Sequence, residues 1–280
     1  MEIHDNDIIF RQEPYSNLNS EWHPDDSKEM YESNIENISS YYKNSRPVIY
    51  TLNSKGYRCE QINSYRGKQF ILVFGCSYTE GIGLHQEDIW HSLIGKELNM
   101  PVMNLGVSGS GPDFQMFNTV QYLKNNFPKP KYVFYQWPSI LRKYFVYGER
   151  QISPYVPQNP EEVDNPDIHA AREDLKWFNN RFLVSRNTAF WDYYQYITIC
   201  NLLWQVKGIT PVHWAWKNDM LEADEVTNIQ DQIIQVYTGP DMLDVARDCS
   251  HPGPMVHKEV VKQLKEHKSV QKIYNVASRN

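Results

Sequence analysis

The chain has 280 residues, 41% of them hydrophobic, which is typical of one large globular domain with a substantial core. Its formal net charge is −6 and it has no long basic run, which argues against nucleic acid or an anionic membrane surface as the main partner. No stretch is long and apolar enough to cross a bilayer, and the N-terminus lacks the basic and apolar regions of a signal peptide. The sequence therefore favours a cytoplasmic protein without membrane insertion.

Residues 1–66 are polar and rich in turn-forming residues, and they are predicted to form an N-terminal extension packed on the main domain. Within them, Tyr31, Ile35, Ile38 and Tyr42 follow helical spacing. Residues 46–61 favour an extended piece or a hairpin that turns at Lys55-Gly56.

From residue 67 to residue 280, short apolar runs alternate with helical patterns. Strands are predicted at 68–75, 100–107, 130–137 and 208–216, and helices at 87–98, 113–126, 188–206 and, after a loop that begins at His251, towards residue 267. Such alternation predicts an α/β fold, a three-layer α/β/α sandwich with a mostly parallel sheet of the flavodoxin-like kind. Proline-rich residues near 140–185 and acidic residues near 217–245 are predicted to be insertions.

Polar or small residues follow three of the predicted strands. Ser77 comes after the first strand, Gly106 to Gly111 after the second, and Gln136 to Ser139 end the third. Because ligands of parallel α/β sheets bind at the carboxyl ends of the strands, these residues are candidates for one site.

A serine hydroxyl becomes a nucleophile when a base removes its proton and a third group orients that base. Near the C-terminus, "DCSHP" supplies Asp248 and His251, three residues apart. On one tight loop, this spacing lets the carboxylate face the imidazole from the side opposite the serine.

Three blocks in this order, "GCSYTEG", "NLGVSGSG" and "DCSHP", resemble those of the SGNH, or GDSL-like, hydrolase superfamily. The first block matches at Gly75, Ser77, Thr79 and Gly81, although Cys76 stands where the family usually has aspartate. The second matches through Asn104, Gly106 and Gly109, and the third through Asp248, His251 and Pro252. The resemblance covers about residues 67–268.

The resemblance implies the role of each matching residue. Ser77 is expected to be the nucleophile, His251 the general base and Asp248 the residue that orients it, with the backbone N–H groups of Ser77 and Gly109 as oxyanion donors. The family usually has a G-x-N-D motif after the third strand, whose asparagine is the last donor, whereas this chain has "QWPS" there. The remaining donor is then the Gln136 amide, the Ser139 hydroxyl, or none.

Other interpretations of these residues stay open. The G-x-S-x-G turn of α/β-hydrolases fails at Thr79, and Cys76 beside a buried strand is better explained as an inert core thiol than as a nucleophile. A metal site from Asp248, His251 and His257 matches no known zinc spacing, so no metal or cofactor is predicted. Glu80 is expected to favour the start of the following helix.

The predicted reaction is hydrolysis of a small ester, with an O-acetylated carbohydrate as one substrate class, through an acyl-enzyme on Ser77. One alternative is an acyltransferase with the same triad, in which an alcohol replaces water in the second step. Another is a catalytically silent binding or structural module with the same fold. The sequence leaves the oligomeric state open.

Overall fold

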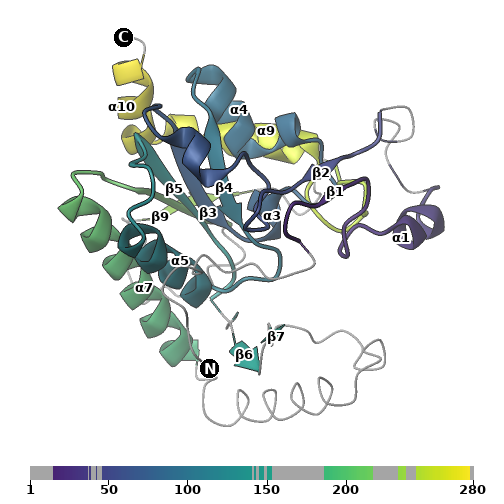
Figure 1. The fold of residues 1–280 in the computed structure, drawn as a ribbon, viewed down its shortest axis with the longest axis horizontal. Coiled ribbons are helices and arrows are strands. Elements are labelled where there is room, and N and C mark those ends of the chain that lie inside the picture. Colours follow the sequence, from purple (N-terminus) through teal and green to yellow (C-terminus); the bar gives the residue numbers. More distant parts are fainter. Residues whose placement is uncertain are drawn as a thin grey trace.

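The computed structural model describes residues 15–36, 38, 42, 46–140, 142, 145–147, 150–152, 186–216, 233–237 and 244–277. A parallel sheet lies at its centre with helices on both faces (Figure 1). The predicted three-layer α/β/α architecture is confirmed.

The central sheet has five strands in the order β4-β3-β5-β8-β9, and all of its neighbouring strands pair in parallel. Its strands are β3 (Ile71–Gly75), β4 (Val102–Gly106), β5 (Tyr132–Trp137), β8 (Val212–Trp216) and β9 (Ile233–Val236). Gly75 of β3 pairs with Gly106 of β4, so both strands end at the same level of the sheet. The loops that follow them therefore lie side by side.

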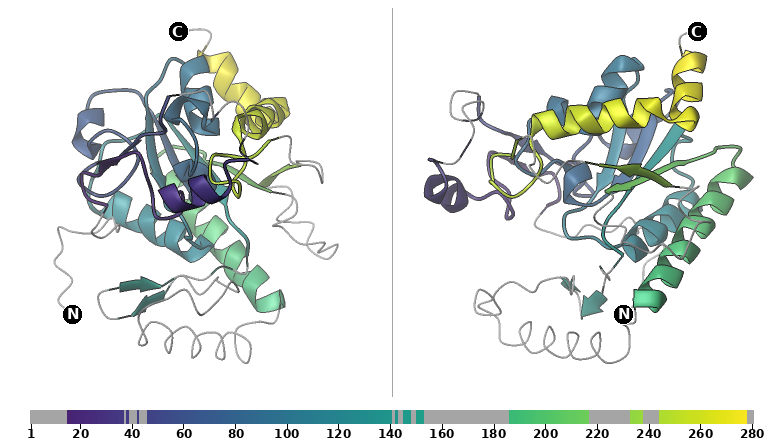
Figure 2. Two further views of the ribbon diagram at one scale, coloured as in Figure 1. Left: turned by 90° about the vertical axis from the view of Figure 1, so that its right-hand side faces the viewer. Right: turned by 180° about the vertical axis from the view of Figure 1, so that it is seen from behind.

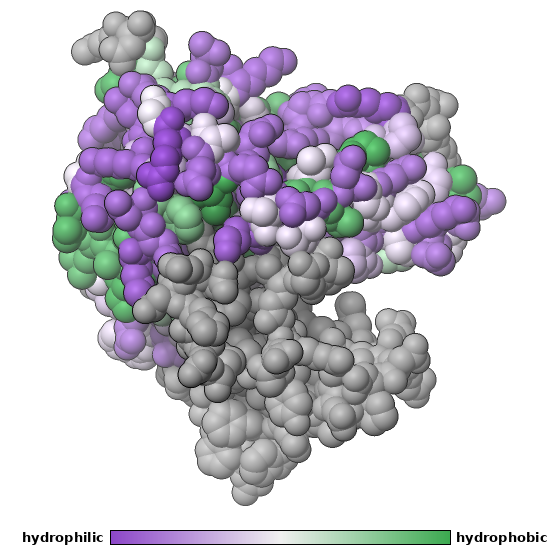
Figure 3. Space-filling model, viewed as in Figure 1, coloured by the Kyte–Doolittle hydropathy of each residue, from purple (hydrophilic) through white to green (hydrophobic). Residues whose placement is uncertain are grey.

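Alternate residues of the strands enter two separate cores, because successive side chains of a strand point to opposite faces. Leu72 and Phe74 belong to one core, whereas Ile71 and Val73 belong to the other. Outside these cores, hydrophilic residues cover most of the described surface that is visible in Figure 3.

Helices cover both faces of the sheet (Figure 2). One face packs against α5 (Pro112–Lys124) and α7 (Arg186–Val206), and the other against α4 (Trp90–Glu97), α9 (Pro254–Glu266) and α10 (Lys268–Ala277). Pro112 and Pro254 stand in the first turn of their helices, where no intrahelical N–H is needed. None of the described helices is long and apolar enough to span a membrane.

The described part of the N-terminal region lies beside α3 (Ser77–Glu80), the short helix that follows β3 (Figure 1). Strands β1 (Asn19–Ser20) and β2 (Tyr50–Thr51) pair antiparallel, and the region also holds α1 (Lys28–Ser33) and the 3-10 helix η1 (Ile62–Tyr65). Its apolar side chains enter both cores, with Val48 and Tyr50 in one and Tyr57 and Tyr65 in the other. The division between residues 1–66 and 67–280 stays a prediction.

Two elements differ from the sequence-based expectations. The helix around Tyr31 ends at Ser33, and the side chain of Asn34 caps its last turn by donating to the Met30 carbonyl at 2.9 Å. The predicted insertion 217–245 supplies β9, which pairs with β8 at the edge of the sheet. A segment of four residues is too short for its sequence to predict this pairing.

The other predicted insertion includes the strands β6 (Phe145–Tyr147) and β7 (Arg150–Ile152), which pair antiparallel. Residues 141, 143–144, 148–149 and 153–185 of it lie outside the described residues, as do residues 217–232 and 238–243 of the second insertion. A second 3-10 helix, η2 (Gln86–Asp88), precedes α4.

Candidate active site

Ser77 is the first residue of the short helix α3, which follows β3, and it is only 4% exposed. The turn between strand and helix is tight: a Cβ on Gly75 would come within 2.0 Å of Thr79 Oγ1. Cys76 is the N-cap, and its carbonyl accepts hydrogen bonds from the N–H groups of Thr79 and Glu80. Only glycine at position 75 lets α3 pack this closely on the end of the strand.

Asp248 and His251 lie on one loop and are hydrogen-bonded to each other, as their spacing predicts. Asp248 Oδ2 is in a short hydrogen bond with His251 Nδ1, and Asp248 Oδ1 accepts the His251 backbone N–H at 3.1 Å. The Asp248 residue is 2% exposed, whereas the His251 side chain keeps 17% of its surface exposed. Because the carboxylate holds a proton on Nδ1, the Nε2 atom of His251 is left with the lone pair that a general base needs.

The loop from Ala246 to His251 is closed by its own backbone. The Ala246 N–H donates to the His251 carbonyl at 2.8 Å, and Cys249 adopts a left-handed conformation with a φ of +57°. A non-glycine residue with positive φ is uncommon, and here it completes the turn between Asp248 and His251. The backbone therefore fixes both partners of the pair in position.

This loop lies against the segment that follows Ser77. The Arg247 N–H donates to the Gly83 carbonyl at 3.1 Å, and a Cβ on Gly83 would come within 3.0 Å of Asp248 Oδ1. The ring of Tyr78, the neighbour of Ser77 in α3, meets the His251 ring edge-on at a centroid distance of 5.6 Å. The structure thus brings the serine helix beside the Asp248–His251 pair.

Within the described part of the chain, no hydrogen bond joins the Ser77 hydroxyl to His251. In proteins without substrate, such catalytic contacts are commonly long and shorten when the substrate binds. The role of Ser77 as nucleophile therefore stays a prediction that its position supports.

Gly109 lies in the loop after β4, beside the end of β3. The Val107 N–H and the Ser110 hydroxyl both donate to the Gly75 carbonyl, at 3.0 and 3.3 Å, and so hold this loop next to Ser77. Gly109 itself has a φ of +72°, which favours glycine. The role of its N–H as an oxyanion donor stays a prediction.

Gln136 has a contact pattern that the sequence did not reveal. Its side chain is fully buried, and Oε1 accepts from the Cys76 N–H at 3.1 Å and from the Thr79 hydroxyl at 3.2 Å. Its Nε2 donates to the Trp137 carbonyl at 3.1 Å. The amide thus braces the turn that carries Ser77, and the role of Gln136 as an oxyanion donor stays a prediction.

Ser139, the other candidate for the third donor, is half-buried beyond the end of β5, and its carbonyl accepts the Arg142 N–H at 3.1 Å. The role of its hydroxyl as the third oxyanion donor stays a prediction. A polar residue in an otherwise apolar strand was the one sequence signal for the bracing role of Gln136.

Several other candidates have structural roles. Cys76 is 1% exposed with its thiol against Gln136 Oε1, and all four cysteines are free. The His257 Nδ1 accepts the Trp90 N–H at 3.0 Å, and burial lowers the pKa of His257 to about 3. Among the described residues, no three side chains of the metal-binding types are grouped to hold a metal ion.

Glu80 does not serve the following helix as expected. It is fully buried, its Oε2 accepts the Ser108 N–H at 2.6 Å, and its Oε1 lies 3.5 Å from His23 Nε2. Because Glu80 is the last residue of α3, its carboxylate connects the serine helix to the loop that carries Gly109. The sequence prediction for Glu80 was wrong because the partner residues are distant in the chain.

The sequence matches no protein-family model and no curated protein. The solved structures that are similar to this chain include two lipolytic proteins. One is a member of the lipolytic protein G-D-S-L family from Veillonella parvula DSM 2008, at 13% identity and a TM-score of 0.41, over 72% of this chain and 98% of that one. The other is a putative lipolytic protein of the G-D-S-L family from Desulfitobacterium hafniense DCB-2, at 12% identity and a TM-score of 0.41, over 71% and 98%.

Proposed function

We propose that the chain is a serine esterase that hydrolyses a small ester through an acyl-enzyme on Ser77. The observation that supports this most strongly is the Asp248–His251 pair, held on a closed loop against the segment that follows Ser77. An imidazole oriented by a buried carboxylate, beside a serine at the end of a parallel strand, is the arrangement that activates a hydroxyl.

In the first step, His251 Nε2 takes the proton of the Ser77 hydroxyl while Oγ bonds to the acyl carbon. The carbonyl electrons move to oxygen, and the backbone N–H groups of Ser77 and Gly109 donate to that oxyanion. When the tetrahedral intermediate collapses, the bond to the alcohol oxygen breaks and the protonated His251 returns the proton to that oxygen. One such donor raises the turnover number by a factor on the order of 10²–10³.

In the second step, His251 takes a proton from water, and the resulting hydroxide attacks the acyl carbon. The second tetrahedral intermediate releases the carboxylic acid, and the proton on His251 returns to Ser77 Oγ. The Asp248 carboxylate stabilises the imidazolium that forms twice in each cycle.

An acetyl ester of a carbohydrate is the substrate class that we favour. The half-buried Tyr78 ring meets both the His251 ring and the Trp216 ring edge-on, at centroid distances of 5.6 and 5.7 Å. An aromatic surface beside the general base suits a sugar ring, whose C–H face packs on aromatic side chains.

Labelling with a fluorophosphonate, read by intact mass, tests the proposal. The wild type is expected to take up one adduct, while Ser77→Ala and His251→Ala take up none. Ser92→Ala, which removes a half-buried serine of α4, is the control and is expected to label like the wild type. Equal labelling of the wild type and Ser77→Ala contradicts the proposal, and so does a correctly folded wild type that does not react.

A further inference from the structure

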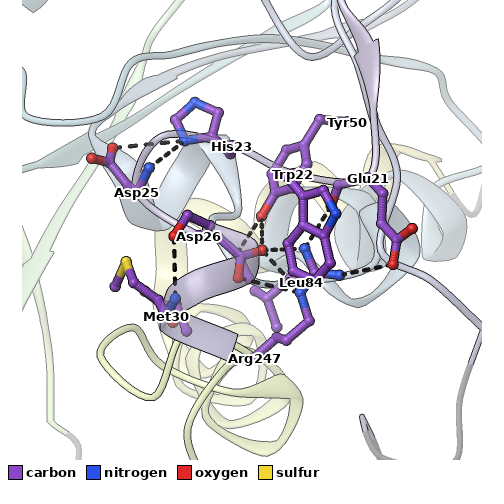
Figure 4. A network of polar contacts seen from close by, with 12 residues as sticks. Glu21, Trp22, His23, Asp25, Asp26, Met30, Tyr50, Leu84 and Arg247 are labelled. Atoms are coloured by element: carbon purple, nitrogen blue, oxygen red, sulfur yellow. Dashed lines mark hydrogen bonds and ion pairs between the residues drawn. The ribbon is translucent and has the colours of Figure 1, made fainter. Parts of the chain in front are cut away.

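The residue before Asp248 is a buried arginine that is held by the N-terminal region. Arg247 is 3% exposed and donates to both carboxylate oxygens of Asp26, with Nη2 to Oδ2 at 2.6 Å (Figure 4). Nη2 also donates to the Glu21 carbonyl at 2.6 Å, and the guanidinium lies over the Trp22 ring at 4.3 Å. Asp26 is itself fully buried, so losing Arg247 would leave its carboxylate buried without a cation.

The ion pair is part of a closed ring of hydrogen bonds that four residues form. The Gly83 N–H donates to the Tyr50 hydroxyl at 2.8 Å, and that hydroxyl donates to Asp26 Oδ2 at 2.5 Å. Asp26 accepts from the Arg247 side chain, and the Arg247 N–H donates back to the Gly83 carbonyl at 3.1 Å. The ring joins the segment after Ser77 to the residue that precedes Asp248.

Residues 21–26, here called the bridge segment, also contact the two other loops of the site. Asp25 Oδ2 accepts from the Ser108 hydroxyl at 2.5 Å, next to Gly109. His23 is 2% exposed, and its Nε2 lies 3.5 Å from the Oε1 atom of Glu80, the last residue of α3. One short segment therefore touches the loops of the predicted nucleophile, the oxyanion donor and the base.

We infer that the bridge segment belongs to the catalytic unit, and that Asp26, Tyr50 and Arg247 are positioning residues that set the place of His251 relative to Ser77. This inference rests on the proposed function, which assigns the roles of Ser77 and His251. None of the three acts on the substrate; each acts through the Gly83 and Asp248 backbone segments that the ring holds together.

The physical basis is that the ring fixes the distance between the segment at Gly83 and the loop that carries Asp248 and His251. Neither segment fixes this distance by itself. Burial raises the pKa of Tyr50 well above its ordinary value, so its hydroxyl keeps the proton that it donates to Asp26. Arginine donates to a carboxylate through a rigid planar fork, which holds orientation as well as distance. Removing one link loosens the approach of His251 to Ser77 without changing either residue.

Tyr50→Phe is the variant that tests the inference, because it removes the central hydroxyl and leaves the buried Arg247–Asp26 pair intact. Arg247→Ala is unsuitable, since it leaves the Asp26 carboxylate buried without its cation. The matched control is Tyr65→Phe, which removes the hydroxyl of a buried tyrosine that donates to the Val102 carbonyl at 2.8 Å, outside the ring. Arg247→Lys is the second variant, which keeps the charge and loses the fork.

Steady-state hydrolysis of p-nitrophenyl acetate is measured for all four proteins, with the thermal midpoint and the NMR signal of the His251 Nδ1 proton. Tyr50→Phe and Arg247→Lys are expected to lower kcat by at least about tenfold with little change in KM, because small misplacements of catalytic groups have such effects. Both are also expected to shift the Nδ1 proton signal. Tyr65→Phe is expected to lose a similar amount of thermal stability, with an unchanged kcat and an unchanged signal.

If Tyr50→Phe and Tyr65→Phe have equal kcat values and equal His251 signals, the inference is overturned while the esterase proposal stands. If the wild type neither hydrolyses the ester nor reacts with a fluorophosphonate, the esterase proposal falls. The His251 signal then decides on positioning alone: a shift in Tyr50→Phe that is absent in Tyr65→Phe supports it, and no shift overturns it.

Discussion

Asp248 binds His251 with both of its carboxylate oxygens, one to the ring Nδ1 and the other to the backbone N–H at 3.1 Å. The same Oδ1 atom also accepts the Ser250 N–H at 3.3 Å. Since the carboxylate contacts ring and backbone together, it determines both the place of His251 and which nitrogen carries the proton.

Replacing this carboxylate by an amide, in Asp248→Asn, keeps the shape of the side chain but places a donor or a weaker acceptor against Nδ1. The imidazole is then held in the wrong tautomer for a base, and kcat for p-nitrophenyl acetate is expected to fall by about 10⁴. The far-ultraviolet circular dichroism spectrum is expected to stay the same. A variant that keeps more than a tenth of the wild-type kcat contradicts the assigned role of Asp248.

Adding a methyl group at Gly83 is expected to force apart the two segments that carry Ser77 and Asp248. A Cβ there would lie 2.8 Å from Ala246 Cβ and 3.0 Å from Asp248 Oδ1. Gly67→Ala is a matched control, because Gly67 has a similar positive φ, +75° against +71°, and no atom within 4 Å of the added Cβ.

Both glycine variants are expected to lose about 1–2 kcal/mol of unfolding free energy from the left-handed backbone alone. Gly83→Ala is expected to lose more than Gly67→Ala and also to lower kcat, whereas Gly67→Ala keeps the wild-type kcat. Urea unfolding and ester hydrolysis give the two readouts. Equal kcat values in the two variants mean that the spacing at Gly83 does not matter for activity.

Gln136→Met tests the bracing role of the buried amide. The substitution keeps the volume but leaves the Cys76 N–H without its acceptor, which is expected to cost about 1–3 kcal/mol of unfolding free energy. Gln205→Met, at an exposed position of α7, is the control and is expected to change stability by no more than about 0.5 kcal/mol. Urea titrations of both variants measure the difference, and equal values contradict the bracing role.

The buried His213 makes stability depend on pH. Its Nδ1 accepts the Trp137 indole N–H at 2.9 Å, and burial lowers the pKa of His213 to about 3 in the folded protein. Below its ordinary pKa, the unfolded chain binds a proton at this residue and the folded chain does not, so acid favours unfolding.

Between about pH 7 and about pH 5, this residue alone is expected to lower the unfolding free energy by about 2 kcal/mol. His213→Gln removes the titrating group while its amide oxygen can still accept from Trp137, so its stability is expected to fall less with acid. Urea unfolding at the two pH values measures the difference. An identical pH dependence in wild type and variant shows that His213 is not held neutral by the fold.

Much of the fold follows from local sequence. Short apolar runs that end in glycine or a polar residue predict β3, β4 and β5, because strands buried on both faces need hydrophobic residues throughout. The three-residue spacing of Asp248 and His251 predicted their contact, since a tight loop determines it. β9 was missed because four residues contain too little periodicity to separate a strand from a loop.

The parts that escaped prediction depend on contacts between distant residues. Asp26 and Arg247 are 221 positions apart, and neither sequence neighbourhood signals the pairing. Gln136 lies at the strand end where the sequence placed it, but its side chain points under α3, a direction that sequence alone does not define. Such contacts decide how the candidate site is held, while local patterns decide which residues are near it.

Trapping the acyl-enzyme shows whether Ser77 becomes acylated with His251 as its base. The wild type is mixed with p-nitrophenyl acetate, quenched in acid within the first turnovers, and analysed by intact mass and peptide mapping beside Ser77→Ala and His251→Ala. We expect one acetyl group on the wild-type peptide that contains Ser77, and none there in either variant. A folded wild type without this acetyl group, or equal acetylation of Ser77→Ala, rules out Ser77 as the nucleophile.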